Sequence, residues 1–391
     1  MQYRNDRHRH PLSILGFGCM RFTRSGGRID LDKAEREILA AFEAGINYFD
    51  TAYIYPDSEE TIGTIFARNA LRERVRIADK LPHYLVKTPA DFDKYFAEHL
   101  RRLQTTYIDC YLMHMLNDLR SWERLCSLGI KDWIAAKKQS GEIGEIGFSY
   151  HGNADEFCKI LDAYDWDFCQ IQYNYLDEHA QAGVTGLRYA ASKGISVIIM
   201  EPLRGGKLAD VPEPVAKAFA KDGRGRSPAE WAFRWLWEQP EVTCVLSGMN
   251  SLEMIAENVR TANDVKVGEF TESDKALIAE AARLIGKGQK VPCTGCRYCM
   301  PCPHGVDIPG VFACVNRRAY DSYVEWMKNY FMTTAMRRES TGASKCVGCG
   351  KCEKHCPQGI AIRAELKKAK RSFEGPVYKV GRWYIKHFMH Y

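Results

Sequence analysis

The sequence predicts an α/β protein with a (β/α)8 barrel in its first part and a smaller, mainly α-helical, cysteine-rich domain in its last part. Two observations predict this division. Short β-branched runs alternate eight times with helical patterns over about 250 residues, which is the size of such a barrel. Eight of the 15 cysteines lie in two tight groups near the C-terminus. We place the barrel at residues 1–285 and the cysteine-rich domain at residues 286–391.

Length and composition place the chain among globular proteins. With 391 residues, 46% of them hydrophobic and 27% charged, it can bury a large core, and disordered and fibrous classes are excluded. The first ten residues hold three arginines and two histidines with no apolar run behind them, so no secretory signal is expected. The longest apolar stretch, residues 195–200, is too short to cross a bilayer. We therefore expect a cytoplasmic protein with no membrane partner.

The runs expected to form strands are followed by segments with helical spacing of apolar residues. After the first run, Asp32 and Glu35 are spaced as a variant capping box, and Gly45 provides a stop signal. Strands that alternate with helices pair in parallel through right-handed crossovers. An open doubly wound sheet is the alternative, but its nucleotide-binding form needs a third glycine that residues 16–21 lack. The expected strands span residues 12–17, 46–52, 75–81, 108–114, 143–149, 168–174, 195–201 and 242–248.

Polar residues stand at or just beyond the ends of the second, third and fourth expected strands, where a barrel carries its chemistry: Asp50, Tyr55, Lys80 and His114. Each has a structural alternative, since an aspartate caps turns, a lysine is solvated and a core histidine is hydrogen-bonded. Together they suit carbonyl reduction, which needs an acid beside the carbonyl oxygen. A tyrosine has a pKa of about 10, and a lysine cation about 4 Å away favours its ionised form by about 4 kcal/mol. An aspartate keeps a buried lysine charged.

The segment that holds the first two of these residues resembles the signature of the aldo-keto reductase family. Lys80 and His114 stand where that family keeps the other members of its catalytic tetrad, and the resemblance covers roughly residues 1–285. It implies a barrel that reduces an aldehyde or ketone with NADPH or NADH, bound without a glycine-rich loop. By this resemblance Tyr55 is the general acid, Lys80 and Asp50 set its pKa, and His114 orients the carbonyl. The matching segments are Asp50-Thr51-Ala52-Tyr53-Ile54-Tyr55, Ser58-Glu59 and Ile62-Gly63.

The resemblance also implies cofactor contacts, with departures from the family pattern. Tyr150 stands where the family has an asparagine at the carboxamide, and Met200 stands where many members stack a tyrosine on the nicotinamide, a contact that a thioether makes less rigidly. Gly248 and Met254 replace a lysine and an arginine that many members direct at the 2′-phosphate. We therefore expect less than about tenfold discrimination between NADH and NADPH, or a preference for NADH. The expected cofactor-binding residues are Ser149, Gln170, Met200, Pro202, Leu203, Arg204, Ser247, Gly248, Met249, Glu257 and Asn258.

The two cysteine groups are typical of iron–sulfur ligands. The first is spaced C-x2-C-x2-C-x2-C-P and the second C-x2-C-x2-C-x3-C-P. The second matches the [4Fe–4S] ferredoxin pattern, in which the fourth cysteine reaches the neighbouring cluster. Zinc is the alternative, but zinc ribbons lack the trailing proline. The short step from Cys299 to Cys302 puts ligation by Cys302 in question. We expect two [4Fe–4S] clusters, bound by Cys293, Cys296, Cys299, Cys302, Cys346, Cys349, Cys352 and Cys356.

The surroundings of the cysteine runs resemble α-helical two-cluster ferredoxin domains attached to reductases. Residues 305–308 and 359–362, which follow the two runs, form an internal repeat offset by 54 residues. The long connection between the runs has helical patterns, as over residues 323–336, and residues 286–288 are expected to form a hinge. Residues 291–391 carry 17 basic and 7 acidic side chains. Anionic clusters offset part of this surplus, so no nucleic-acid partner is expected.

Two classes of function remain open at this point. The first is an NAD(P)H-dependent reductase of a small carbonyl compound, which the tetrad favours. Nicotinamide delivers two electrons as hydride, whereas an iron–sulfur cluster accepts one at a time. The clusters are then structural or redox-sensing, or a flavin bridges the two, or the substrate takes single electrons. The second class is an electron-transfer protein whose barrel is a docking body and whose partner is a ferredoxin or another redox protein.

Overall fold

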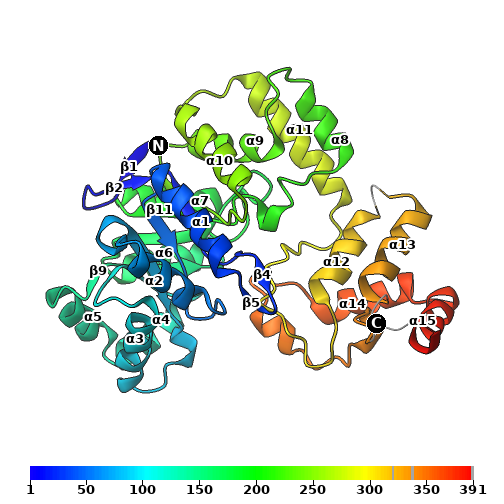
Figure 1. Cartoon of the computed structure of the whole chain (residues 1–391), viewed down its shortest axis with the longest axis horizontal. Helices are drawn as coiled ribbons and strands as arrows, with labels where there is room; N and C mark the ends of the chain where they lie inside the picture. Colours follow the sequence, from blue (N-terminus) through cyan, green and yellow to red (C-terminus); the bar gives the residue numbers. More distant parts are fainter. Residues whose placement is uncertain (319–320, 336–338, 389–391) are drawn as a thin grey trace. The chain divides into compact units, whose positions relative to one another are not determined.

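Parallel strands form a closed barrel in the first part of the chain (Figure 1). The computed structural model describes residues 1–318, 321–335 and 339–388. Neighbouring strands follow the order of the sequence, and the last strand pairs with the first, so the predicted barrel is confirmed. The barrel strands are β3 (Leu15–Gly18), β6 (Tyr48–Asp50), β7 (Arg76–Leu81), β8 (Ile108–Met113), β9 (Ile143–Tyr150), β10 (Phe168–Gln172), β11 (Ser196–Met200) and β12 (Val242–Ser247).

The first expected strand, residues 12–17, is divided between two sheets. Its beginning belongs to β2 (Pro11–Ser13), which pairs antiparallel with β1 (Tyr3–Asn5), and only β3 enters the barrel. The Asn47 side chain holds the dividing point, because it accepts the Ser13 N–H and donates to the Pro11 carbonyl, both at 2.8 Å. A side chain from a distant segment thus satisfies backbone groups that a continuous barrel strand would pair.

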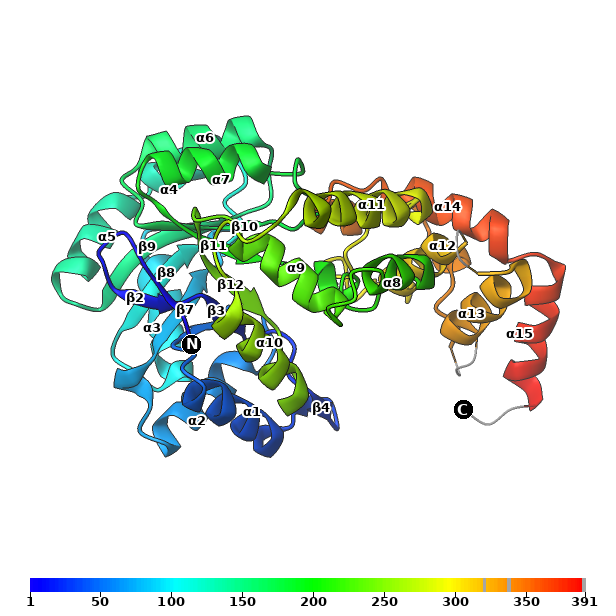
Figure 2. The ribbon, with the colours of Figure 1, turned by 90° about the horizontal axis from the view of Figure 1, so that it is seen from above.

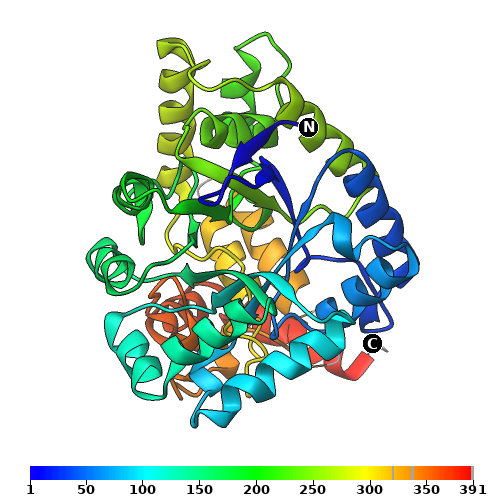
Figure 3. The same cartoon turned by 90° about the vertical axis from the view of Figure 1, so that its left-hand side faces the viewer.

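Helices follow the strands and surround them (Figure 3). The first begins where the Asp30 side chain accepts the Lys33 N–H at 3.0 Å, so the cap lies two residues before the expected capping box at Asp32. Ala34, Ile38 and Ala41 of this helix are buried, as the helical spacing requires. The barrel helices are α1 (Leu31–Glu43), α2 (Ser58–Arg68), α3 (Ala90–Leu103), α4 (Leu119–Ser127), α5 (Ile130–Gln139), α6 (Ala154–Ala163), α7 (Gly183–Ser192), α9 (Pro228–Trp237) and α10 (Leu252–Asp264).

Short elements complete the first part of the chain. They are the hairpin β4 (Arg24–Ser25) and β5 (Arg28–Ile29), and the 3-10 turns η1 (Arg72–Arg74) and η2 (His83–Leu85). The barrel interior is packed with side chains from alternate strand positions, including Tyr48, Phe168 and Leu246. Gly16 is needed there, because a Cβ atom at this position would lie 2.8 Å from Leu246 and 2.9 Å from the Cys244 sulfur.

The chain divides into two compact units, residues 1–203 with 229–271 and residues 204–228 with 272–391. The expected domain division after residue 285 stays a prediction. The second unit is mainly helical, and α8 and α11 lie side by side in it (Figure 2). Its elements are η3 (Arg204–Gly206), α8 (Glu213–Ala220), α11 (Glu272–Gly288), α12 (Ile308–Arg317), α13 (Tyr323–Thr334), η4 (Ala343–Lys345), η5 (Lys351–His355), α14 (Ile362–Phe373) and α15 (Pro376–Phe388).

Aromatic side chains form the core of the second unit. Phe373 of α14 stacks on Tyr330 with ring centroids 4.0 Å apart and lies 4.2 Å from the Trp326 centroid.

The internal repeat in the sequence corresponds to two helices, α12 and α14. They begin at equivalent points after the two cysteine runs, as the repeat predicts. Residues 286–288, the expected hinge, form the last residues of α11, which ends at Gly288, and hinge motion there stays a prediction. None of the described helices combines the length and apolar composition needed to span a membrane.

Candidate active site and cysteine sites

The residues expected to form a catalytic tetrad come together at the rim where the barrel strands end. Asp50 is the last residue of β6, Lys80 lies near the end of β7, and His114 directly follows β8. Tyr55 lies in the loop between β6 and α2. Asp50, Lys80 and His114 are each at most 3% exposed. The parallel strands bring these residues from separate parts of the sequence to one end of the barrel.

The Lys80 ammonium is held by Asp50. Its Nζ donates to the two carboxylate oxygens at 2.8 and 2.7 Å and to the Thr51 carbonyl at 2.5 Å. Burial raises the pKa of Asp50, while the Lys80 charge and a hydrogen bond from Gln170 oppose that rise. The pair thus keeps a positive charge in a buried position.

Tyr55 and His114 complete the tetrad. The Lys80 Nζ lies 5.4 Å from the centre of the Tyr55 ring. The Tyr55 and His114 rings meet edge to face, with centroids 6.3 Å apart and planes at 88°. Burial first, and then the Lys80 charge, hold the pKa of His114 well below its usual value, so its imidazole is neutral near pH 7. Its Nδ1 is buried and has no hydrogen-bond partner among the described residues.

Ser149 and Gln170 lie opposite each other on the paired strands β9 and β10. The Ser149 Oγ accepts the Met115 N–H at 2.8 Å, which leaves its own hydrogen available for donation. The Gln170 amide donates to Asp50, and its Oε1 is buried with no hydrogen-bond partner in the described part of the chain. The two side chains therefore offer a donor and an acceptor, which are the groups that a primary carboxamide requires.

Other expected cofactor residues lie at the ends of the last two strands. Met200 ends β11 and is partly buried, and Pro202 and Leu203 follow it. At the end of β12, the Ser247 Oγ accepts a hydrogen bond from Asn258 of α10 at 3.2 Å. Both of these side chains are buried; the same segments carry Gly248, the buried Met249 and the partly buried Glu257.

Arg204 and Tyr150 have other surroundings. Arg204 belongs to the second unit, where its Nη1 donates to Gln289 at 2.5 Å and its charge acts on Cys293. The structure therefore does not bring it together with Ser149 and Gln170 within one unit. The Tyr150 hydroxyl, which replaces the family's asparagine, donates to the Asn153 carbonyl of its own loop at 2.5 Å.

A basic residue that the sequence reasoning missed lies beside Gly248. A Cβ atom at Gly248 would lie 3.2 to 3.3 Å from the side-chain carbons of Arg21. Arg21 follows the first barrel strand, and its Nη2 lies 3.7 Å from the Glu201 carboxylate. A lysine at position 248 would need space that Arg21 now takes. The signal for this residue was its place directly after a strand, at the rim where barrels bind ligands.

The cysteines of the first run do not form a site alone. Cys293, Cys296 and Cys299 line a pocket together with Cys356, the last cysteine of the second run. The walls between them are apolar and include Phe312 and the first residues of α12 and α14. Burial and the neighbouring cysteines raise the pKa of Cys299 to about 12. Four cysteine side chains that line one pocket suit the binding of a metal cluster.

The last cysteine of the first run likewise lies near cysteines of the second run. Cys302, from the end of the first run, lies near enough to Cys352 to act on it electrostatically, as does Cys346. Cys349 of this run is exposed. The last cysteine of each run thus lies with cysteines of the other run, as in two-cluster ferredoxins. The structure places Cys302 with the second run despite its short spacing.

A sequence profile described as the aldo/keto reductase family matches residues 14–282. The chain belongs to the aldo/keto reductase family. A second profile, a 4Fe-4S dicluster domain, matches residues 292–361. The resemblance that the tetrad segment predicts is therefore confirmed, together with the iron–sulfur domain behind it.

Several known proteins and solved structures are similar to about 70% of this aldo/keto reductase chain. It is 27% identical over 297 residues to an L-galactose dehydrogenase of Arabidopsis thaliana, covering 70% of this chain and 91% of that protein. It is also 27% identical over 312 residues to a 6-dehydroglucose reductase of Novosphingobium aromaticivorans, covering 72% and 94%. The holo form of an aldo-keto reductase of Bacillus halodurans superposes with a TM-score of 0.59 at 23% identity over 72% of this chain and 96% of that one. A Klebsiella pneumoniae aldo-keto reductase in complex with NADPH gives a TM-score of 0.56 at 19% identity, covering 71% and 94%.

Behind the tetrad, this reductase contains a buried ionic network that the sequence reasoning missed. His99 Nδ1 lies 2.6 Å from Glu59 and 2.9 Å from Asp79, and Arg102 Nη1 donates to Glu59 at 2.7 Å. The Asp79 carboxylate accepts the backbone N–H of Lys80 at 2.7 Å. The two carboxylates raise the pKa of His99 to about 9 against the opposing effect of burial. The only signal in the sequence was Glu59, which belongs to the tetrad segment.

Two further histidines surround His114. Burial lowers the pKa of His83 and that of His151 to about 4. Tyr84, which is 46% exposed, lies 6.4 Å from the His114 ring centroid. Two neutral imidazoles and an exposed phenol therefore lie near His114. These loop positions follow strand ends, but nothing in their spacing marks them in the sequence.

Proposed function

We propose that the barrel reduces an aldehyde or ketone with NADPH or NADH, with Tyr55 as the general acid. The observation that carries this proposal is the position of Lys80, bound to Asp50 at 2.7 Å and 5.4 Å from the Tyr55 ring centre. A nicotinamide cofactor, when bound, supplies the hydride for the carbonyl carbon. The chain must then supply the proton for the carbonyl oxygen, and Tyr55 is the acid at this rim.

The tetrad residues divide the work of proton transfer. Tyr55 donates its hydroxyl proton to the carbonyl oxygen, and the Lys80 cation stabilises the tyrosinate that remains. With the 5.4 Å from Nζ to the Tyr55 ring centre taken as the separation of the charges, and an effective dielectric of about 20, this attraction is worth about 3 kcal/mol. Asp50 keeps Lys80 charged, and the neutral His114 donates a hydrogen bond that orients the carbonyl. His114 is suited to this role because a cationic imidazole would repel Lys80.

The residues present fit a nicotinamide cofactor. The Ser149 hydroxyl and the unpaired Oε1 of Gln170 would hold its carboxamide. Arg21, beside Gly248, would supply the positive charge for a cofactor phosphate. The expectation of weak discrimination between the two cofactors rests on Gly248 and Met254, and Arg21 supports a preference for NADPH instead.

The two groups of four cysteines fit two [4Fe–4S] clusters. Cys293, Cys296, Cys299 and Cys356 would bind one, and Cys302, Cys346, Cys349 and Cys352 the other. Clusters of this kind supply one-electron chemistry when bound. Hydride transfer at the barrel needs no such electrons, so carbonyl reduction and cluster chemistry can be measured separately.

The test of the proposed function is Tyr55→Phe. The variant removes one hydroxyl and should abolish NAD(P)H-dependent reduction across a panel of aldehydes, ketones and quinones, while cofactor binding by fluorescence titration changes less than about threefold. Tyr107→Phe is the matched control, because Tyr107 lies before β8, at the other end of that strand from His114, and should keep full activity. Unchanged turnover of Tyr55→Phe on any substrate that the wild type reduces would refute the assignment of Tyr55.

A further inference from the structure

We propose that a basic trough between α14 and α15 docks a small, acidic, one-electron carrier protein of the ferredoxin type. The proposal goes beyond the proposed carbonyl reduction and does not depend on the tetrad. It rests on the charge of the trough, the spread of its cations, and its position beside the second cysteine group.

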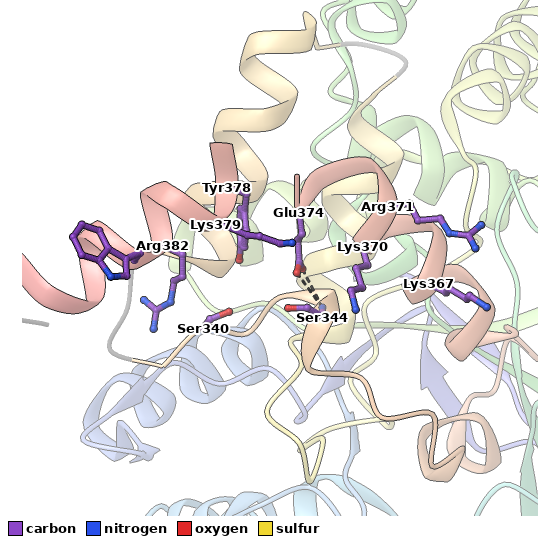
Figure 4. A pocket seen from close by; sticks show the side chains of 10 residues that line it. Ser340, Ser344, Lys367, Lys370, Arg371, Glu374, Tyr378, Lys379 and Arg382 are labelled. Carbon is purple, nitrogen blue, oxygen red and sulfur yellow. Dashed lines mark hydrogen bonds between the residues drawn. The ribbon is translucent and has the colours of Figure 1, made fainter. Parts of the chain in front are cut away.

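The trough is a cavity of about 640 Å³ lined by both helices and the loop that leads to η4 (Figure 4). Its charged residues are Lys367, Lys370 and Arg371 of α14, Lys379 and Arg382 of α15, and Glu374 between the helices. It therefore holds five cations and one carboxylate.

The single carboxylate does little to offset these cations. Glu374 is buried and accepts hydrogen bonds from the Tyr330 hydroxyl at 2.5 Å and the Ser344 N–H at 3.1 Å. In residues 339–388, as far as they are described, Lys367, Lys370, Arg371 and Lys379 are exposed and form no ion pair with a carboxylate. Their neighbours on the same helix differ, since Lys368 pairs with Glu365 at 2.7 Å. Four exposed cations without a carboxylate partner therefore lie together along the trough.

The arrangement of the cations favours a protein partner over a small anion. Figure 4 shows Lys367 and Arg371 pointing away along α14, Lys370 pointing toward Ser344, and Arg382 lying at the far end on α15. They do not converge on one point, as the ligands of a single phosphate would. Trp383, which is 57% exposed, adds an aromatic contact of the kind enriched in protein interfaces. A row of separated cations with an aromatic contact matches an acidic protein surface.

The trough lies next to the more exposed of the two cysteine groups. Ser344 lines it and precedes Cys346 by two residues, so their Cα atoms are at most about 7 Å apart. Cys349 of the same run is exposed, and its neighbour Val347 is 64% exposed, whereas Cys293 of the other group is buried. A cluster bound at this group would be the one within reach of a docked carrier. Such a cluster would exchange one electron with the carrier at each encounter, so that the reduced partner loses the electron, the oxidised partner gains it, and no bond or proton moves.

The experiment uses the full chain with its clusters reconstituted anaerobically, and the probe is an acidic bacterial two-cluster ferredoxin. The variant Lys370→Glu/Lys379→Glu reverses two trough charges. We expect its association rate constant, measured by surface plasmon resonance at low ionic strength, to fall at least about tenfold with little change in the dissociation rate constant. The difference should shrink at about 0.5 M salt, where the Debye length is about 4 Å. Iron content and circular dichroism must match the wild type.

Two control variants distinguish binding at the trough from an overall effect of the protein's net charge. Lys370→Arg/Lys379→Arg keeps both charges and should bind as the wild type does. Lys217→Glu/Lys221→Glu reverses two exposed charges at α8 in the same compact unit, outside the trough, and should reduce association less than about threefold. An equal loss in this control would overturn the proposal.

Three other occupants of the trough would each give a different result in binding experiments. Binding of anionic lipid vesicles without binding of ferredoxin would show a membrane contact. Micromolar binding of pyrophosphate that blocks the trough would show a small-anion site. Self-association lost in the charge-reversal variant would show an interface with a second copy. Each of these outcomes, or wild-type ferredoxin binding that is insensitive to salt, overturns the proposal.

Discussion

Replacing Lys80 by methionine tests how the buried ion pair acts on Tyr55. The substitution keeps an unbranched side chain of similar length and removes the charge. From the distance of 5.4 Å to the Tyr55 ring centre, the lost stabilisation of tyrosinate is about 3 kcal/mol at an effective dielectric of about 20. We expect kcat/KM for a verified carbonyl substrate to fall about 10²-fold. Cofactor affinity should change little, because Lys80 is occupied by Asp50 and Thr51.

Lys80→Met should also change how the free energy of unfolding depends on pH. Asp50 loses its partner, and burial then raises its pKa further above the ordinary aspartate value. A folded-state carboxyl pKa above the unfolded value means that the folded protein binds more protons, so the free energy of unfolding falls as pH rises above about 4. Loss of one partner of a buried pair costs about 3 to 5 kcal/mol once the carboxylate is ionised. Lys80→Met/Asp50→Asn removes both charges and should remove this pH dependence.

Urea unfolding at several pH values and steady-state kinetics check both parts. A decrease in kcat/KM below threefold for Lys80→Met would refute the idea that Lys80 stabilises the tyrosinate. Equal pH dependence of unfolding in the single and double variants would refute the pairing argument for Asp50.

Three further predictions concern the network, the cofactor and the clusters. Between pH 6.5 and 9, the free energy of unfolding of the wild type should fall by about 3 kcal/mol relative to that of His99→Gln. The reason is that the folded-state pKa of His99 is raised to about 9, so the stability that protonated His99 contributes is lost as pH rises through that value. Urea-unfolding profiles of the two proteins that run parallel over this pH range would contradict the prediction. Arg21→Ala should weaken NADPH binding about 10- to 150-fold and NADH binding much less in paired fluorescence titrations, whereas equal losses would mean that Arg21 does not contact the 2′-phosphate. Cys302→Ala should lower the iron content after anaerobic reconstitution from about eight to about four per chain, with the loss at the site of Cys346 and Cys352, and eight irons in this variant would exclude Cys302 as a ligand.

The sequence predicts what depends on local pattern and on strand ends. The eight strand runs were found because parallel barrel strands are buried on both faces, and the tetrad because each member stands at or near such an end. The sequence predicts the helix cap at Asp32, whereas the structure has it two residues earlier, at Asp30. Both are aspartates, so only the backbone geometry distinguishes them. The division of the first run depends on Asn47, a residue 34 positions from Ser13.

What the sequence does not reveal depends on contacts between distant segments. Arg21 and Gly248 lie far apart in the sequence although they are in contact in the fold. The absence of the family's lysine at position 248 therefore gives no sign in the sequence that Arg21 fills its space. The short step from Cys299 to Cys302 argues against Cys302 as a cluster ligand, but its neighbours in the fold are cysteines of the second run. Residues 204–228 follow a barrel strand in the sequence, yet they pack with the second unit.

The exchange of Cys302 and Cys356 between the two cysteine runs has a consequence for maturation. Each group of sulfurs is drawn from both ends of the segment between residues 293 and 356. As the chain leaves the ribosome, the first run emerges with only three of the sulfurs of its group, and that group is complete only once Cys356 of the second run has been made. Cluster insertion is therefore a late event that couples both sites. Oxidative loss of one cluster would also release the loop that anchors the other, so the two would be gained and lost together.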